Sequence, residues 1–215
     1  MKKAVIFDMD GTLLRTELIL EESLHQTLLE LDKYRITYIE QPMKKYNEIM
    51  GVPLDEVWKE LLLNPAEDNR VLANEIFQNA LIECIESGNS RLYDDVEKTL
   101  GYIQSMGYTI FIASNGDEKY LSAIYKHHEL DQFIENVYSI NEVETNDKTN
   151  LIKHIIEVED VEPEYIVGDR LSDFTAGREN GIDVIGCKFH FSKDEELSEA
   201  DYIVESLSQL ESVIK

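Results

Sequence analysis

The segment AVIFDMDGTLL, residues 4–14, joins an apolar run to two acids that are separated by a single residue. The valine, isoleucine and phenylalanine of this run favour a buried strand. Side chains at positions i and i+2 of an extended segment point to the same side, so Asp8 and Asp10 are expected to lie close together. Two neighbouring carboxylates repel, which raises the pKa of at least one of them. The pair therefore predicts a compensating cation nearby.

The chain has 215 residues, 43% of them hydrophobic, which is enough for a core in one domain with an insertion, or in two domains. No segment approaches the roughly 18 uncharged apolar residues of a membrane span, and no signal-peptide pattern opens the chain. We therefore expect a soluble, cytoplasmic protein. Cys84 and Cys187 are far apart in sequence and are expected to be reduced core thiols.

The balance of charge restricts the partners. With 44 acidic and 20 basic residues, the formal net charge is −24. Such a charge repels nucleic acid and anionic membrane surfaces, so neither is expected as a partner. It also repels a free phosphate ester, so a site for one must invert the potential locally with a metal ion, a lysine or backbone N–H groups.

Strand and helix patterns alternate through most of the chain. A first strand is expected in the opening apolar run, with Asp8 and Asp10 at its end. Further strands are expected at residues 108–114, 136–140, 165–169, 183–187 and 201–204. Helices are expected at residues 94–105, 118–127, 149–157, 172–180 and 206–214. This βαβα order predicts the α/β class, with a Rossmann-like, doubly wound parallel sheet.

The exception is the stretch after the first strand, which has only helical patterns. LILEESLHQTLLELDK (18–33) and NRVLANEIFQNALIECIES (69–87) repeat apolar residues at intervals of three and four. We therefore expect residues 1–15 and 88–215 to form the α/β core domain. Residues 16–87 are expected to form an inserted, all-helical cap domain.

Polar residues follow four of the expected strands. In open parallel sheets, ligands bind beyond the carboxyl ends of the strands, so these residues should meet in one crevice. The hydroxyl and flexible backbone of Ser114, Asn115 and Gly116, which lead into a helix N-terminus, also suit an anion. The residues at the four strand ends are Asp8, Asp10, Gly11 and Thr12, then Ser114, Asn115 and Gly116, then Lys148, and finally Asp169 and Asp173.

Collected together, these side chains suit phosphoryl transfer assisted by Mg²⁺. Asp8, Asp10, Asp169 and Asp173 offer the hard oxygen ligands that Mg²⁺ prefers. An ionised Asp8 beside the metal and Lys148 could attack phosphorus and form an aspartyl-phosphate. Asp10 would then protonate the leaving oxygen and later deprotonate water.

Each motif taken alone has an ordinary explanation. Asp-Gly-Thr and Ser-Asn-Gly are common turns, a lysine near a helix start is usually solvated, and Gly-Asp often ends a strand at a helix cap. Turn chemistry does not predict their order at successive strand ends. The order therefore favours the functional interpretation.

In this order, DMDGT, a serine that ends a strand, a lysine and GDRLSD resemble the motifs of the haloacid dehalogenase superfamily. GDRLSDFTAGRENGI is most similar to its phosphoglycolate phosphatase-like and β-phosphoglucomutase-like branch. The resemblance extends over the whole chain, cap included. The resemblance implies that Asp8 is the nucleophile and Asp10 the general acid and base. It also implies that Asp8, the Asp10 carbonyl and Asp169 bind Mg²⁺ with support from Asp173, and that Ser114 and Lys148 hold phosphate. Thr12 and Asn115 are expected to contact phosphate as well.

This chain departs from the family pattern at two positions. Thr149 follows Lys148 where many relatives have proline, and Arg170 follows Asp169 where a small residue is frequent. The role of Arg170 stays open at this point. Asp10 argues against a dehalogenase, because those relatives lack an acid two residues after the nucleophile.

Three functions are therefore weighed. The first is a Mg²⁺-dependent phosphatase that hydrolyses a small phosphomonoester metabolite and acts as a monomer or weak homodimer. A sugar-phosphate mutase would return the phosphoryl group to substrate instead of water. A phospho-accepting receiver domain also uses acids, lysine and Mg²⁺, but its paired acids adjoin each other and it carries no cap.

The expected cap is acidic, which bears on the choice of substrate. Residues 16–87 contain 15 acidic and 6 basic residues, a formal charge of −9. The glycine-centred loop of residues 50–58 lacks the arginine that the resembled mutases use for a second phosphate. A monophosphate with a neutral remainder is therefore expected to be preferred, because like charges oppose binding. In the resembled family this loop reaches the active site, so we expect it to influence specificity.

Overall fold

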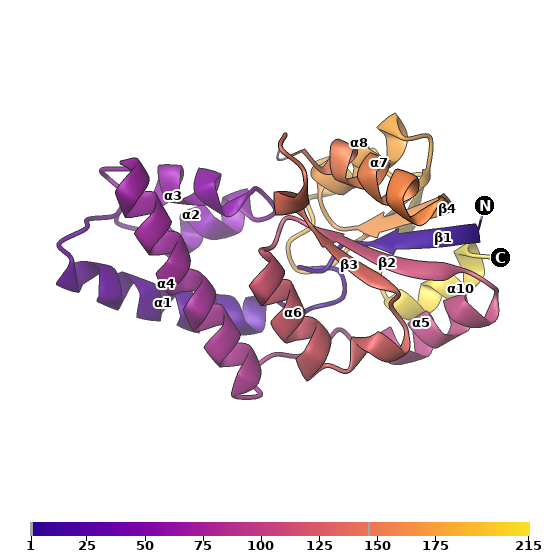
Figure 1. Ribbon diagram of the computed structural model, residues 1–215, viewed down its shortest axis with the longest axis horizontal. Helices are drawn as coiled ribbons and strands as arrows, with labels where there is room; N and C mark the ends of the chain where they lie inside the picture. Colours follow the sequence, from indigo (N-terminus) through magenta and orange to yellow (C-terminus); the bar gives the residue numbers. More distant parts are fainter. Residues whose placement is uncertain (1, 146) are drawn as a thin grey trace.

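The computed structural model describes residues 2–145 and 147–215. Within these ranges the strands form a six-stranded sheet with the order β3-β2-β1-β4-β5-β6 (Figure 1). Each pair of neighbours is parallel. The strands are β1 (Lys2–Phe7), β2 (Thr109–Ser114), β3 (Asn136–Ser139), β4 (Val161–Gly168), β5 (Asp183–Cys187) and β6 (Tyr202–Val204). The predicted α/β fold is confirmed, and the strand order changes direction at β1, where such sheets bind ligands.

Helices cover both faces of the sheet, as Figure 1 shows. Ala4 and Ile6 of β1 pack into one apolar cluster, and Val5 and Phe7 pack into the other. This alternation is the period of two that a strand imposes on its side chains. The first cluster lies under α7 (Lys148–Glu159) and α8 (Leu171–Glu179), and the second lies under α5 (Val96–Ser105), α6 (Glu118–His127) and α10 (Leu210–Val213). A single-turn helix, α9 (Asp194–Leu197), precedes β6.

A helical lobe, residues 17–86, lies beyond the carboxyl ends of the strands (Figure 1). Its helices are α1 (Glu17–Lys33), α2 (Pro42–Ile49), α3 (Leu54–Leu61) and α4 (Glu67–Glu86). The lobe has its own apolar centre, where the fully buried ring of Trp58 meets Phe77 edge-on at 5.6 Å between centroids. Such aromatic pairs stabilise a core beyond the area that they bury.

Two connecting segments join the lobe to the sheet, and they run side by side. The N–H of Arg15 donates to the carbonyl of Arg91 over 2.9 Å, and the N–H of Tyr93 donates to the carbonyl of Leu13 over 2.9 Å. Backbone pairing therefore fixes where the lobe leaves and rejoins the sheet.

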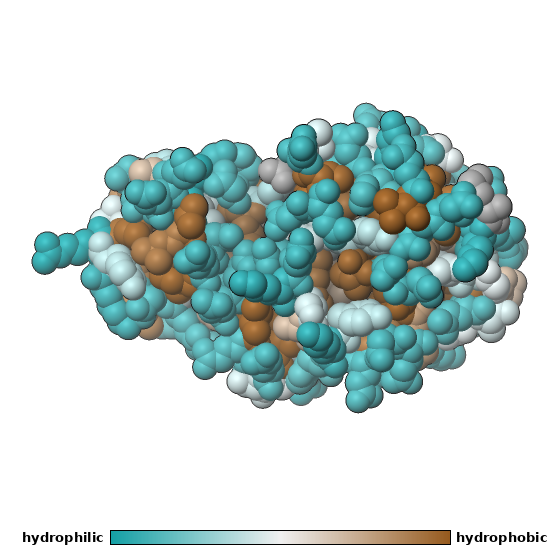
Figure 2. All heavy atoms as spheres, in the orientation of Figure 1, coloured by the Kyte–Doolittle hydropathy of each residue, from teal (hydrophilic) through white to brown (hydrophobic). Residues whose placement is uncertain are grey.

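Hydrophilic residues cover most of the face drawn in Figure 2, as the high content of charged residues leads one to expect. Within residues 2–145 and 147–215, no helix has the length and apolar character needed to span a membrane. Cys84 and Cys187 are both buried and free.

Several element boundaries differ from the sequence expectation, most of them by one or two residues. Strand β1 ends at Phe7, so both acids lie just beyond it, although the N–H of Asp8 still donates to the carbonyl of Val167 over 2.8 Å. Strand β4 starts at Val161 and contains Pro163, beside a shift of register against β1; a proline cannot donate to the ladder, and such irregularities accommodate it. The expected helix at residues 206–214 divides into a 3₁₀ turn, Leu207–Gln209, and α10. Tight turns of this kind are frequent at helix ends.

A pair of glycine substitutions tests how closely α8 packs on the sheet. A Cβ on Gly177 would lie 2.4 Å from Ile166 Cγ2, whereas a Cβ on Gly101 in α5 would meet Phe133 at an ordinary 3.7 Å. Overpacking should make Gly177→Ala less stable by about 1–3 kcal/mol, and Gly101→Ala should be neutral or more stable by up to about 1 kcal/mol. Urea unfolding measures both free energies. Equal effects of the two substitutions would contradict this packing.

Candidate active site

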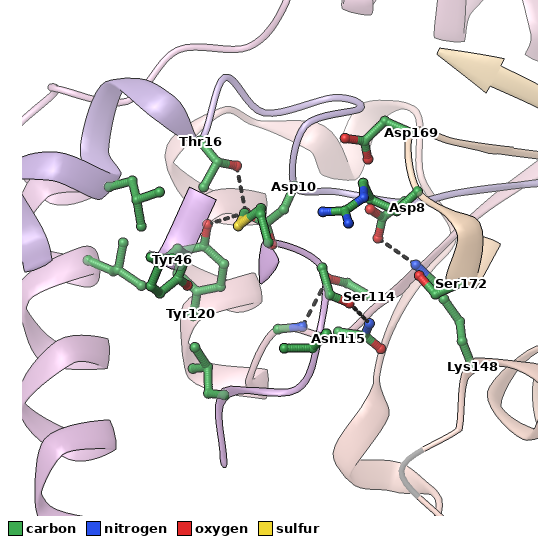
Figure 3. A pocket seen from close by; sticks show the side chains of 18 of the residues that line it. Asp8, Asp10, Thr16, Tyr46, Ser114, Asn115, Tyr120, Lys148, Asp169 and Ser172 are labelled. Carbon is green, nitrogen blue, oxygen red and sulfur yellow. Dashed lines mark hydrogen bonds and ion pairs between the residues drawn. The ribbon is translucent and has the colours of Figure 1, made fainter. Parts of the chain in front are cut away.

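The carboxyl ends of β1, β2 and β4 meet the helical lobe around a cavity of about 60 Å³ (Figure 3). Its position at the strand ends and its polar lining suit a small polar ligand. Most of the residues expected at the site from sequence are brought together in its lining: Asp8, Asp10, Ser114, Asn115, Lys148 and Asp169. The lobe contributes Tyr46, Met50, Gly51, Val52 and Leu54, among others.

Lys148 is the cation that the paired acids predict. It begins α7, after the N-cap Asp147, and its side chain is 4% exposed. Its Nζ lies 2.7 Å from Asp8 Oδ1 and forms a second ion pair with Asp173. Burial by itself would lower the pKa of Lys148, but the charges of Asp173 and Asp8 outweigh it and raise the pKa. The lysine is therefore charged, and it holds two acids from different parts of the chain.

Asp8 differs from an ordinary aspartate mainly because it is buried. Burial raises its pKa to about 7, while the charge of Lys148 acts in the opposite direction and that of Asp173 adds to the rise. Repulsion from Asp10, which the sequence suggested as the cause, makes a smaller contribution. Burial thus poises this carboxylate near neutral pH, where the balance of charge around it decides whether it is ionised.

Asp10 has partners of its own, which sequence reasoning missed. Its Oδ1 accepts hydrogen bonds from Thr16 Oγ1 at 2.7 Å and from the hydroxyl of Tyr120 at 2.6 Å (Figure 3). Burial raises the pKa of Asp10, and these two donors oppose the rise. Since both donors use Oδ1, a proton carried by Asp10 would reside on Oδ2. Tyr120 lies in the first turn of the helix that follows Ser114, and this position at a strand end could have indicated that it contacts the site.

Asp8, Asp169 and Asp173 offer carboxylate oxygens that lie within 4.8 Å of one another. All three residues are buried. Asp169 Oδ2 finds no hydrogen-bond partner among the residues that the structure describes. Burial raises the pKa of Asp169 well above its ordinary value, and the negative charge of Asp8 adds to the rise. An orphaned carboxylate oxygen within an acidic cluster is the donor set that a hard divalent cation prefers.

The turn after β1 explains both Gly11 and Thr12. Gly11 has φ +75°, and a Cβ there would lie 2.5 Å from Asp169 Oδ2, so only glycine permits this approach. The side chain of Thr12 is fully buried, and its hydroxyl donates to Asp169 Oδ1 at 3.3 Å. Thr12 is not among the described residues that line the cavity, and its expected contact with phosphate stays a prediction. The turn holds Asp169 in place.

The end of β2 connects the cavity to the lobe. Ser114 Oγ accepts a hydrogen bond from the N–H of Gly116 at 3.0 Å. The Nδ2 of Asn115 donates to the carbonyl of Gly51 at 2.6 Å. The glycine-centred loop therefore reaches the cavity, as expected, and one of the residues expected at the phosphate site holds it there.

Comparisons with known proteins extend along nearly the whole chain. A family model described as haloacid dehalogenase-like hydrolase matches residues 5–187. A phosphoglycolate phosphatase from Vibrio vulnificus is 24% identical over 226 residues, which cover 99% of this chain and 96% of that protein. Pyrophosphatase PpaX from Bacillus mycoides is 25% identical over 96% of this chain and 94% of its own. A solved structure described as a predicted phosphatase from Clostridium acetobutylicum has a TM-score of 0.80 at 22% identity, covering 100% of this chain and 98% of that one.

The raised pKa of Asp8 predicts how stability depends on pH in metal-free buffer. The folded chain retains a proton up to about pH 7, whereas an unfolded aspartate releases it near pH 3.9. Folding therefore takes up a proton in this range, and the contribution of Asp8 to stability falls as pH rises from about 4 to about 7. Asp8→Asn removes this contribution, so its stability relative to wild type should increase across the range.

Urea unfolding in the presence of a chelator measures the two profiles. The exposed Asp32→Asn is the matched control, and its profile should run parallel to that of the wild type. A stability profile of Asp8→Asn that runs parallel to the wild-type profile would show that burial does not raise the pKa of Asp8.

Proposed function

The chain belongs to the family of haloacid dehalogenase-like hydrolases, and on that premise we propose that it is a Mg²⁺-dependent phosphatase that hydrolyses a small phosphate monoester. Family membership removes the receiver-domain alternative. The observation that carries the proposal is the buried group of Asp8, Asp169, Asp173 and Lys148 at one end of a small cavity. Three acids and one fixed cation are suited to phosphoryl transfer once a divalent ion balances the charge.

The acidic cluster fits Mg²⁺ in charge and in chemistry. Three carboxylates face a single lysine, and one oxygen of Asp169 has no partner in the described chain. Asp8 and Asp169 would hold the ion together with the carbonyl of Asp10, and Asp173 would support it. When bound, the ion supplies positive charge beside the phosphoryl oxygens.

Asp8 is the proposed nucleophile. One of its oxygens forms a bond to phosphorus while the bond from phosphorus to the leaving oxygen breaks, which gives an aspartyl-phosphate. Lys148 donates to Asp8 Oδ1, so it favours the ionised carboxylate and stands beside the charge that develops on the phosphoryl group. The hydroxyl of Ser114 and the backbone at Asn115 line the same space and offer donors to phosphate oxygens.

Asp10 is the proposed proton carrier. In the first step, it gives its proton to the leaving oxygen, so the alcohol departs neutral. In the second step, it accepts a proton from the water that attacks the aspartyl-phosphate, which releases phosphate and regenerates Asp8. Tyr120 and Thr16 hold the carboxylate by one oxygen, which leaves the other for the proton.

We further propose that residues 16–87 act as a cap domain over a core domain of residues 1–15 and 88–215. The loop at Gly51 and the apolar side chains of Leu20, Met50 and Leu54 close the cavity from the lobe side. Closure excludes water other than the attacking molecule and restricts the site to small substrates.

Binding of Mg²⁺ can be tested without turnover. A ligand at 100 times its Kd stabilises the folded state by about 2.7 kcal/mol, which for a chain of this size raises Tm by roughly 5–10 °C. Saturating Mg²⁺ should raise the Tm of the wild type, and Asp169→Asn should remove most of the rise. Asp32→Asn serves as the control, with NaCl at equal ionic strength as the blank. A rise in Asp169→Asn equal to that of the wild type would place the ion elsewhere.

The role of Asp10 predicts a dependence on the leaving group. With Mg²⁺, the wild type should release phosphate from alkyl phosphates and from p-nitrophenyl phosphate, and Asp8→Asn should release essentially none from either. Asp10→Asn should slow the alkyl phosphates by about 10²- to 10⁴-fold, because an alkoxide needs a proton to leave. The nitrophenolate should be affected far less.

Measurements of kcat/KM for the wild type, Asp8→Asn and Asp10→Asn with both classes of ester test the two proposed roles. More than a tenth of wild-type activity in Asp8→Asn would reject Asp8 as nucleophile. Equal losses for both leaving groups in Asp10→Asn would show that the acid lies elsewhere.

A further inference from the structure

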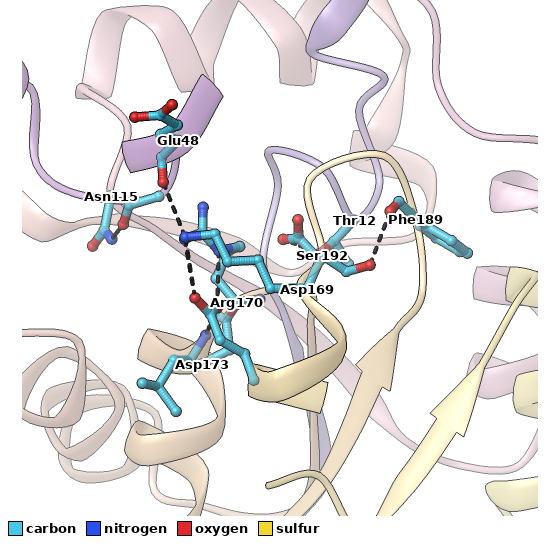
Figure 4. Close-up of polar contacts among 12 residues, drawn as sticks. Thr12, Glu48, Asn115, Asp169, Arg170, Asp173, Phe189 and Ser192 are labelled. Carbon is cyan, nitrogen blue, oxygen red and sulfur yellow. Dashed lines mark hydrogen bonds and ion pairs between the residues drawn. The ribbon is translucent and has the colours of Figure 1, made fainter. Parts of the chain in front are cut away.

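Arg170 lies directly after Asp169, at the N-cap of α8. Its Nε and Nη2 donate to the two oxygens of Glu196, at 3.0 and 3.3 Å. The third nitrogen, Nη1, is buried and has no hydrogen-bond partner within residues 2–145 and 147–215. Figure 4 shows Arg170 next to Asp169 and Asp173, on the side of the site that faces the lobe.

Arg170 lies at the edge of the cavity, with its buried Nη1 under the glycine-centred loop. Arg170 lines the same cavity as Asp8 and Lys148. A Cβ on Gly51 would lie 3.5 Å from Nη1, so this nitrogen is beneath the glycine-centred loop. Gly51 has φ +96°, a conformation in which glycine is favoured and the loop can approach the arginine closely.

Neighbouring residues hold the guanidinium in this position. Glu196 also accepts a hydrogen bond from the N–H of Leu171 at 2.9 Å. Lys193 Nζ lies 3.5 Å from Glu196 Oε1 and donates to the carbonyl of Glu48, in the last turn of α2, at 3.0 Å (Figure 4). The two-point contact with Glu196 is the geometry that fixes an arginine most firmly. Nη1 is therefore preorganised, and a ligand would not have to order it.

Lys148 and Arg170, the two cations of the site, differ in whether they have a hydrogen-bond donor left without an acceptor. Lys148 is occupied by Asp8 and Asp173. Arg170 leaves one buried nitrogen without an acceptor, and leaving a buried charged donor unpaired is unfavourable. A ligand that brings an anionic acceptor to this point would satisfy the donor.

We propose that Arg170 is a specificity residue that binds a second anionic group of the substrate, at the end away from the ester phosphate. A carboxylate is an acceptor that suits a single free guanidinium nitrogen. This inference rests on the proposed phosphatase function. It reverses the sequence expectation of a neutral remainder, because the core supplies the cation that the acidic lobe lacks.

A matched pair of esters tests the role of Arg170. Phosphoglycolate and 2-hydroxyethyl phosphate differ in a carboxylate against a hydroxymethyl group. Hydrogen bonds to charged groups imply a preference of about 10- to 100-fold, so the wild type should favour phosphoglycolate in kcat/KM by this factor. Arg170→Gln should lose the preference, because kcat/KM for phosphoglycolate should fall further than kcat/KM for the neutral ester. Arg170→Lys should recover part of it.

Arg178→Gln is the matched control, because Arg178 lies on the same helix and also pairs with a glutamate, Glu199, but is exposed. It should keep the wild-type preference. A wild type without preference, or an Arg170→Gln variant that loses activity equally on both esters, would overturn the inference while leaving the phosphatase function in place.

Calorimetric binding of the two esters, without Mg²⁺, separates the inference from the proposed function. If neither ester is hydrolysed, the proposed function fails for these substrates. Tighter binding of phosphoglycolate that depends on Arg170 would still support the inference, and equal binding of both esters would reject it.

Discussion

The buried contact of Lys148 with Asp8 and Asp173 is the interaction on which the site depends. It joins the end of β1, the start of α7 and the first turn of α8. Removing one member of a buried ion pair leaves a charge without compensation, which typically costs about 3–5 kcal/mol. The same contact sets the chemistry, because burial and Lys148 act in opposite directions on the pKa of Asp8. Architecture and reactivity therefore share one group of side chains.

A second level of organisation links the lobe to this group through backbone carbonyls. Asn115 donates to the carbonyl of Gly51, and Lys193 donates to that of Glu48. Side chains from the sheet side thus hold the lobe by its main chain, and Arg170 packs against the lobe at Gly51. Because the lobe closes a small cavity, its position decides which groups reach the carboxylates. Because the lobe is acidic and repels an anionic substrate, a cation from the sheet side would be needed to offset that repulsion.

The sequence predicts contacts that follow from the order of strands and helices, but not contacts that depend on how side chains pack across elements. A parallel sheet brings the carboxyl ends of its strands together, so the meeting of Asp8, Lys148 and Asp169 could be foreseen from the order of motifs. The inward hydroxyl of Thr12 and the contact of Tyr120 with Asp10 depend on side-chain packing across elements, which periodicity does not report. The free nitrogen of Arg170 depends in addition on Glu196, a residue in an acidic run that resembles a solvated surface.

Trapping the covalent intermediate tests most directly whether Asp8 attacks phosphorus. Wild-type protein is mixed with Mg²⁺ and a hydrolysed phosphate ester, quenched within a turnover and treated with borohydride, which reduces an acyl phosphate to an alcohol. Mass spectrometry of the peptides then locates the modified residue. The account predicts homoserine at position 8, formed only in the presence of substrate and absent from Asp8→Asn. Turnover without modification at this position, or modification of a different acid, would contradict it.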